Sequence, residues 1–439
     1  MNRHQIFAAL AVPISALSVT LAPSVAHGQL TPPVGATAVS ASRQLTLTEA
    51  LRLALDNNPR LRAASGDRLM RIGQASERSA FSNPHVEWRR EGTGTTGGVD
   101  DFLTVALPLD LTGRRFVARG AVSATRRSAE ADSIAIARAV AFDAARAYHR
   151  SALATSLSAV AARQQGVMED MARYDSTRWR EGAAAEIVSL RASLEAGRSR
   201  AASIRAALDA RRAQAELAIA LGLPVDSVGI PMPIELDEAG ALDDRALLTV
   251  DELAANALER RPEVQAAREA VRAAELAARV EQLGMLGDVT IGGGSRRSGG
   301  ETGGTISVGM NIPLLNRNGA ARQQASGELL AARAEQRRVE LLVLAEVTAA
   351  AEEYQRLREG LTTTVADEAR RGAEVAEIVQ AAYREGGATL LELLDAQRAA
   401  AETAATVLGW MTDMEIARLD LLQASGAPLS EAMREERSR

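Results

Sequence analysis

The chain has 439 residues and a formal net charge of −5, from 51 basic and 56 acidic side chains, which argues against non-specific binding of nucleic acid. Hydrophobic residues make up 46% of the chain but aromatic residues only 3%, a composition typical of long, closely packed helices rather than of disordered chains or enzymes with large aromatic pockets. The absence of cysteine excludes disulfides, thiolate metal sites, cysteine nucleophiles and lipid attachment to an N-terminal cysteine.

The first 28 residues have the pattern of a secretory signal peptide. A positive start precedes a largely apolar stretch at 6–21, and the small residues Ala26 and Gly28 fit a cleavage site. The alternative, a transmembrane anchor, is disfavoured because the apolar stretch is shorter than about 18 residues and contains Pro13. We therefore expect an exported protein, in which residues 29–44 form an N-terminal linker.

The rest of the chain is expected to consist of two copies of one unit, at 45–222 and 248–425. A linker at 223–247 joins them, and a C-terminal tail at 426–439 follows. Three landmarks recur in the same order at an offset of about 204 residues, which points to an internal repeat. They are a Leu-Thr helix start before a proline (at 45–59 and 248–262), a Pro-Leu pair (108–109 and 313–314) and an aromatic-Arg-Glu-Gly stretch (179–182 and 383–386).

Each unit is predicted to contain two short helices, a β-hairpin and a long helical hairpin, so the fold class is mainly α with a small β part. Thr48 and Asp251 are the expected N-caps of the first helix in each unit. These helices should end before Pro59 and Pro262, since the residue before a proline avoids the helical conformation. The helical hairpins should use long outgoing helices at about 114–181 and 319–385 and return helices at about 185–221 and 389–423.

Alternating apolar and polar residues predict two strands in each unit. The strands are expected at about 84–91 and 99–109, and at about 285–293 and 304–314, with a loop rich in Gly, Ser and Arg between the last two. Val105, Leu107, Val308 and Met310 would then lie on one face, and Thr104 and Ser307 on the other.

Amphipathic strands of this length fit an outer-membrane barrel, whose strands need about 9 to 11 residues. No sheet edge stays open in a bilayer, so the strands must close. Four strands are too few for a barrel, whereas three chains would supply twelve around an open lumen. The apolar face would contact outer-membrane lipid. The alternative is a soluble β-hairpin inserted into a helical protein.

The sequence resembles the TolC-like family of outer-membrane efflux proteins over residues 43–425. The resemblance rests on the repeated helix starts, Asn83-Pro84, the Pro-Leu pairs, and the stretch at 383–386 followed by 390–398. The segment at 312–319 is similar to that of the heavy-metal (CzcC-like) branch, with Leu315 where that branch usually has phenylalanine.

The resemblance implies a homotrimer, in which a twelve-stranded outer-membrane β-barrel continues into a periplasmic α-helical barrel. It implies a passive exit duct of a tripartite efflux system, whose partners are a periplasmic adaptor (membrane fusion) protein and an inner-membrane RND-type transporter. Heavy-metal cations, drugs and proteins of type I secretion all stay open as substrates. The competing class is a periplasmic helical-hairpin adaptor or a structural coiled coil, but an adaptor would carry one helical hairpin inside flanking β-domains.

We find no catalytic, cofactor or metal motif and expect no enzymatic activity. The resemblance implies that Glu392 and Asp395, one helical turn apart, line the periplasmic aperture. The alternative is a solvated helix face on which Arg398 pairs with Asp395. The resemblance also implies that the hairpin tips contact the adaptor, although a plain turn would explain them too; the tip residues are Arg180, Glu181, Gly182, Ala183, Arg384, Glu385, Gly386 and Gly387.

Overall fold

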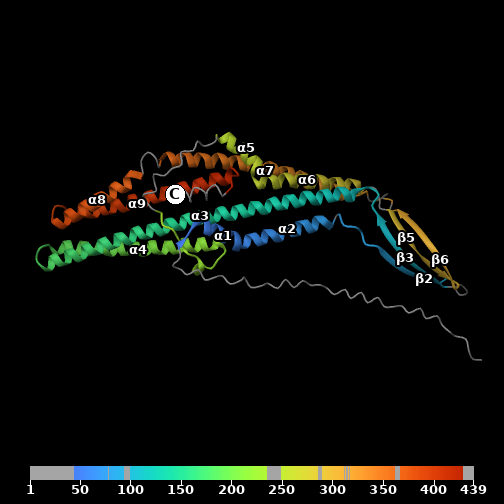
Figure 1. Ribbon diagram of the computed structural model, residues 1–439, viewed down its shortest axis with the longest axis horizontal. Coiled ribbons are helices and arrows are strands. Elements are labelled where there is room, and N and C mark those ends of the chain that lie inside the picture. The colour runs from blue at the N-terminus through green and yellow to red at the C-terminus, as the bar shows by residue number, and fades with distance from the viewer. Residues whose placement is uncertain are drawn as a thin grey trace, which may run out of the picture.

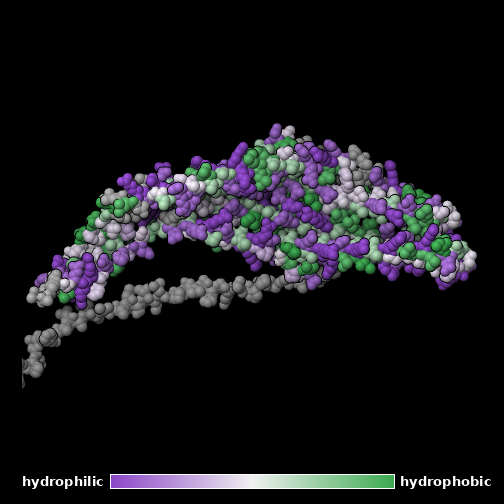
Figure 2. Space-filling view, turned by 180° about the vertical axis from the view of Figure 1, so that it is seen from behind, coloured by the Kyte–Doolittle hydropathy of each residue, from purple (hydrophilic) through white to green (hydrophobic). Residues whose placement is uncertain are grey.

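The computed structural model describes residues 44–77, 79–92, 99–234, 249–284, 289–310, 312, 315, 317–360 and 366–428. The expected signal peptide, nearly all of the linker at 29–44, and most of the linker at 223–247 and of the tail at 426–439 lie outside these residues. The molecule is elongated, with a β-sheet at one end and two helical turns at the other (Figure 1). Hydrophilic residues gather at the free end of the sheet, with hydrophobic residues next to them (Figure 2).

The expected order of elements is present in both halves of the chain, so the mainly helical fold with a small sheet is confirmed. The first half contains α1 (Leu47–Asn57), α2 (Pro59–Glu77), β2 (His85–Gly92), β3 (Val99–Leu109), α3 (Arg114–Arg180) and α4 (Glu186–Leu221). The second half contains α5 (Val250–Arg260), α6 (Pro262–Leu283), β5 (Val289–Ser298), β6 (Glu301–Met310), α7 (Gly319–Gly360), α8 (Ala366–Glu385) and α9 (Leu390–Ala424). The outgoing helix of the second half is therefore described as two helices, α7 and α8.

The N-caps of α1 and α5 lie two residues before the predicted ones. Thr46, not Thr48, accepts a hydrogen bond from the Glu49 amide, at 3.2 Å. Thr249, not Asp251, caps α5, and its backbone N–H donates in return to the Glu252 carboxylate, at 2.9 Å. The Thr-x-x-Glu spacing of a capping box was the better guide, because the cap residue must be extended and three positions before its partner.

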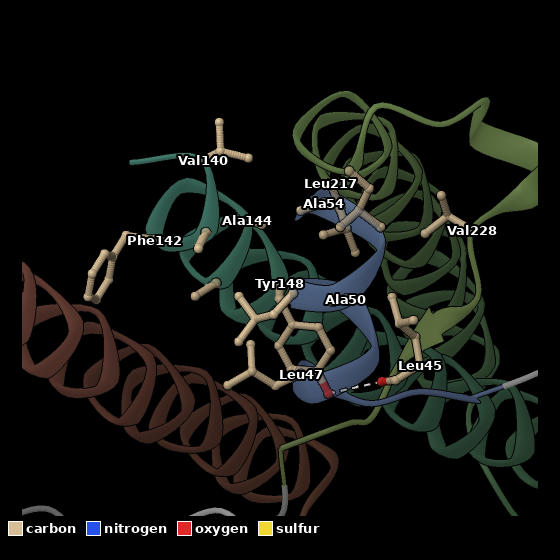
Figure 3. Close-up of a cluster of buried hydrophobic side chains, with 14 of the residues drawn as sticks. Leu45, Leu47, Ala50, Ala54, Val140, Phe142, Ala144, Tyr148, Leu217 and Val228 are labelled. Atoms are coloured by element: carbon tan, nitrogen blue, oxygen red, sulfur yellow. Dashed lines mark hydrogen bonds between the residues drawn. The ribbon is translucent and has the colours of Figure 1, made fainter. Parts of the chain in front are cut away.

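Part of the chain expected to be linker forms a short parallel ladder at the middle of the molecule. Strand β1 (Gln44–Leu45) pairs with β4 (Ile230–Pro231), just after the 3₁₀ turn η1 (Val225–Ser227). Beside this ladder, the Tyr148 hydroxyl of α3 donates to the Leu45 carbonyl at 3.0 Å (Figure 3). Side chains of α1, α3 and α4 complete the buried cluster there, among them Leu47, Ala50, Phe142 and Leu217.

The long helices pack through small side chains. α3 has 67 residues and so extends about 100 Å. Its neighbours include α2 and α6, and α6 in turn packs against α7, so these four helices lie side by side. Alanines are buried along α3, as at Ala118, Ala124 and Ala129, and they allow close approach of neighbouring helices.

The four longer strands form one antiparallel sheet in the order β2-β3-β5-β6. The loop predicted between the last two strands is wrong in extent: only Gly299 and Gly300, with φ of 55° and 96°, separate β5 from β6. Glycine usually disfavours strands, but a Cβ at Gly294 would overlap the Leu103 carbonyl of β3. Glycine there permits close backbone approach, so the same residues that indicated a loop are part of the ladder.

Candidate functional site

The sheet has one apolar face that is set by its register. Val105 of β3 lies opposite Val86 of β2 and Gly293 of β5, and Gly293 lies opposite Ile306 of β6. Because side chains alternate along a strand, these pairs fix which residues share a face. The apolar face consists of Val86, Trp88, Leu103, Val105, Leu107, Leu109, Val289, Ile291, Ile306, Val308 and Met310.

The four residues expected to contact lipid all belong to the apolar face. Val105, Leu107, Val308 and Met310 have exposed fractions of 47%, 42%, 72% and 63%. Large hydrophobic side chains that share one exposed sheet face mark an interaction surface. Thr104 and Ser307 lie on the opposite face, as expected from the alternation.

The opposite face is polar and charged. It contains His85, Glu87, Arg89, Glu91, Asp100, Thr104, Arg296, Glu301, Thr305 and Ser307, with one aromatic residue, Phe102. The guanidinium groups of Arg89 and Arg296 lie 5.3 and 5.6 Å from the centre of the Phe102 ring. Arg296 also donates to the Asp100 carboxylate at 2.6 Å. One face of the sheet therefore suits an apolar environment, and the other suits water.

The two helical turns lie at the opposite end of the molecule from the sheet (Figure 1). Each reverses at a glycine in the left-handed conformation, Gly182 with φ 73° and Gly386 with φ 81°. The hydrogen-bond pattern is the same in both: Ala183 donates to the Arg178 carbonyl and Gly387 to the Ala382 carbonyl. All eight residues predicted to form the tips are exposed.

Two tyrosines join the tips to each other. The Tyr383 hydroxyl of α8 donates to Asp175 Oδ1 of α3 at 2.7 Å, and the Tyr174 hydroxyl of α3 donates to the Arg384 carbonyl at 2.9 Å. Met171 and Leu393 are buried beside this pair. Asp175 is not among the residues predicted from the sequence; its signal is a carboxylate four residues after Met171, on the same side of α3.

Asp175 is a buried carboxyl with one unsatisfied oxygen. Its Oδ2 has no hydrogen-bond partner among the residues that the structure describes. Burial raises the pKa of Asp175 above its ordinary value, although the hydrogen bond from Tyr383 and the charge of Arg178 oppose this shift. Burial, followed by the hydrogen bond to Asp175, likewise raises the pKa of Tyr383. The contact between the tips is therefore sensitive to the charge of one carboxyl group.

The acidic pair predicted for the aperture lies at the start of α9, with Glu392 in its first turn and Asp395 in its second, and both side chains are exposed. Glu392 completes a capping box, because its carboxylate accepts from the backbone N–H and the hydroxyl of Thr389, at 2.7 and 2.8 Å. These two bonds lower the pKa of Glu392, which keeps it ionised at neutral pH. The carboxylate thus has a local structural role that the sequence analysis did not foresee.

Asp395 forms no ion pair with Arg398 in the described part of the chain. Arg398 instead lines a cavity of about 230 Å³ between α3, α4 and α9, together with Glu195 and Arg198. The alternative interpretation, a solvated face held by an Asp395–Arg398 pair, therefore lacks its expected contact. Asp395 is left as an exposed carboxylate next to the tip.

Neither a metal cluster nor a membrane-spanning helix is found within the described ranges. No three His, Asp or Glu side chains there come together as metal ligands. No described helix combines the length and the apolar character needed to cross a bilayer. Of the described histidines, His85 begins β2, and the ring of His149 in α3 packs edge to face with that of Tyr148.

Comparison with known proteins connects this geometry to a family. Residues 253–427 match the family model described as outer membrane efflux protein. None of the curated protein sequences compared with the chain matches it. This match nonetheless confirms the resemblance to the TolC-like family in residues 253–427, and the solved structures share the fold.

Three solved structures illustrate the likeness. The outer-membrane channel OprN has a TM-score of 0.71 and 20% identity, covering 87% of this chain and 90% of its own. A membrane protein from Pseudomonas aeruginosa has a TM-score of 0.70 and 21% identity, covering 87% and 93%. CusC has a TM-score of 0.69 and 18% identity, covering 89% and 94%. The fold is that of the solved outer-membrane channels OprN and CusC.

We predict that Asp175 makes stability depend on pH. The pKa of Asp175 is higher in the folded than in the unfolded protein. Its contribution to the free energy of unfolding is therefore fully present below the pKa of the unfolded state, about 3.9. That contribution is lost as the pH rises through the pKa of Asp175 in the folded protein. Asp175→Asn keeps an oxygen that can accept from Tyr383 but cannot lose a proton. Thermal unfolding should therefore show the wild type losing stability relative to Asp175→Asn as the pH rises from about 4.

Tyr383→Phe is the matched variant, because it removes only the hydroxyl that Asp175 accepts. Leaving this buried carboxyl without its donor should cost about 1 to 3 kcal/mol at neutral pH. If the stability of the wild type and of Asp175→Asn changed with pH in the same way, the raised pKa of Asp175 would be contradicted.

Proposed function

We propose that the chain is the exit duct of a tripartite efflux system, a passive channel from the periplasm through the outer membrane. The observation that carries the proposal is the amphipathic four-stranded sheet at one end of a helical body whose longest helix, α3, extends about 100 Å. The match of residues 253–427 to outer membrane efflux proteins and the shared channel fold support it.

The open edges of the sheet favour a homotrimer. β2 and β6 are the edge strands, and neither has an outer partner in the described chain. Pairing β2 of one copy with β6 of the next would satisfy both edges, and three copies would give a closed barrel of twelve strands. With the apolar face outward, the polar face of Thr104, Arg296 and Ser307 lines a wet lumen.

The apolar face has a height suited to an outer membrane. From Leu103 to Leu109 it extends about 20 Å along β3, close to the roughly 25 Å apolar band of such barrels. Leu111 and Ile312, just beyond the strands toward the helices, are 72% and 60% exposed and continue the apolar surface. The helices would then extend into the periplasm, after export by the signal peptide at 1–28.

The exposed tips are the surface we assign to the periplasmic adaptor, and an inner-membrane RND-type transporter would supply the substrate through it. Heavy-metal cations are our first candidate substrate, because of the similarity at 312–319 to the CzcC-like branch. Drugs and secreted proteins are the alternatives. A periplasmic adaptor or structural coiled coil would have no use for an exposed apolar sheet face, which argues against that class.

Asp395 and Glu392 are the groups we assign to the periplasmic aperture. Both are exposed at the start of α9, next to the tip, and Asp395 has no intrachain partner among the described residues. Three copies would bring six carboxylates together, and such a ring attracts cations. The capping hydrogen bonds of Glu392 hold its carboxylate in a fixed position in each chain.

The assembly itself is the direct test of the proposed function. Detergent-extracted protein should have the mass of a trimer in native mass spectrometry, and cell fractionation should place it in the outer membrane. A monomeric protein recovered from the soluble periplasm would instead support the adaptor or coiled-coil alternative.

Adjacent residues on β6 test the assignment of the faces. Val308→Arg should destabilise the barrel by about 2 to 4 kcal/mol, since it places a charge in lipid near the membrane centre. Ser307→Arg, on the polar face, should cost much less. Equilibrium unfolding of the protein in lipid vesicles measures both, and equal costs would mean that the faces are assigned wrongly.

The aperture is tested with substitutions that respect the helix cap. Glu392→Gln keeps a capping box, which accepts Glu or Gln, and Asp395→Asn removes the second charge. The double variant should reduce cation selectivity in planar bilayers and weaken block by divalent cations. Glu392→Ala should in addition lower helix stability, because it removes the bonds from Thr389. Unchanged selectivity in the double variant would place these residues away from the aperture.

A further inference from the structure

A row of charged side chains crosses the sheet on the same side as the apolar face. Arg90 of β2 lies opposite Asp101 of β3, Asp101 lies opposite Arg297 of β5, and Arg297 lies opposite Thr302 of β6. The next row toward the helices begins with Trp88 and Leu103 and belongs to the apolar face. We call Arg90, Asp101, Arg297 and Thr302 the charged row.

The two arginines of the charged row differ in their contacts. Arg90 donates from Nε and Nη2 to the two carboxylate oxygens of Asp101, at 2.7 and 3.0 Å, and its guanidinium lies 5.4 Å from the Trp88 ring centre. Arg297 is exposed and forms no hydrogen bond or ion pair among the described residues. With one carboxylate and two guanidinium groups, the row carries one net positive charge in each chain.

The neighbouring arginine on β5 lies on the opposite face of the sheet and has different contacts. Arg296 points to the polar face, where it is bonded to Asp100 and stacked on Phe102. Arg297, one residue later, has the opposite orientation; the Asp101 carboxylate attracts it electrostatically, but it forms no hydrogen bond or ring contact within the described chain. The net positive charge of the row is therefore on the side that the proposed function assigns to lipid.

The position of the charged row matches the border of a membrane. It lies beside the turn at Gly299 and Gly300, at the end of the sheet far from the helices, where hydrophilic residues gather (Figure 2). If the helices are periplasmic, as proposed above, this end lies at the outer leaflet. Arginine at such a border can keep its charged group in the headgroup region while its stem covers apolar surface.

We propose that the charged row binds phosphate groups of the lipid headgroups in the outer leaflet. A guanidinium matches two phosphate oxygens at once, and Arg297 has its donors available. Asp101 holds Arg90 in place and leaves part of that guanidinium exposed, with 59% of the side chain accessible. Closure of the sheet into a trimer would repeat the row three times around the barrel, which suits a surrounding layer of phosphate-bearing glycolipid.

The test compares two adjacent arginines. Binding of lipopolysaccharide to the detergent-extracted trimer is measured for the wild type, Arg297→Gln and Arg296→Gln. Arg297→Gln should bind about fivefold more weakly, the effect of one arginine near an anionic surface, and Arg296→Gln should bind like the wild type. Thr302→Arg adds a charge to the row and should bind about fivefold more tightly, a gain that misfolding cannot produce.

Two further ligands identify the source of the phosphate. Dephosphorylated lipopolysaccharide should bind all variants alike, and inorganic phosphate at equal concentration should not compete. Equal binding by the wild type, Arg297→Gln and Thr302→Arg would overturn the proposal, as would equal losses in Arg297→Gln and Arg296→Gln. Channel formation in phosphatidylcholine bilayers tests the proposed function separately. A wild type that forms channels but does not bind lipopolysaccharide would contradict only the proposal that the charged row binds lipid phosphate.

Discussion

The antiparallel register of the sheet is the constraint on which the functional interpretation depends. It joins side chains from two distant parts of the chain into one apolar face and one polar face, as the pairing of Val105 with Gly293 illustrates. A shift of one residue in any strand would move its whole set of side chains to the wrong face. The proposed membrane contact, the proposed polarity of the lumen and the position of the charged row therefore all follow from the same ladder.

Much of this arrangement could be predicted, because period-two alternation is a local property of sequence. The alternation around Val308 identified both the strand and its apolar side correctly. The extent of β5 and β6 was wrong because glycine was interpreted by its conformational freedom alone. Its other role, permitting a neighbouring backbone to come close at Gly294, depends on a strand almost 200 residues away and leaves no local signal.

At the tips, too, features that depend on neighbouring residues could be predicted, whereas contacts between distant residues could not. Helix reversal at Gly182 and Gly386 could be predicted from the sequence, since each glycine follows a long helix. The bond between Tyr383 and Asp175 could not, because it joins residues 208 positions apart in the sequence. Even Glu392, which the resemblance implied as an aperture residue, has a second role in its capping box, and that role was visible in the Thr-x-x-Glu spacing.

The alanines between the long helices have a geometric consequence for any tube built from this chain. Four helices, α2, α3, α6 and α7, lie side by side, and buried alanines such as Ala118 and Ala124 allow neighbouring axes to approach toward the close end of the usual range of about 8 to 10 Å. In a closed ring the axis spacing multiplied by the number of helices is the circumference. The width of the bore is therefore set by the size of side chains that never touch what passes through it, and larger residues at these contacts would widen the channel rather than fill it.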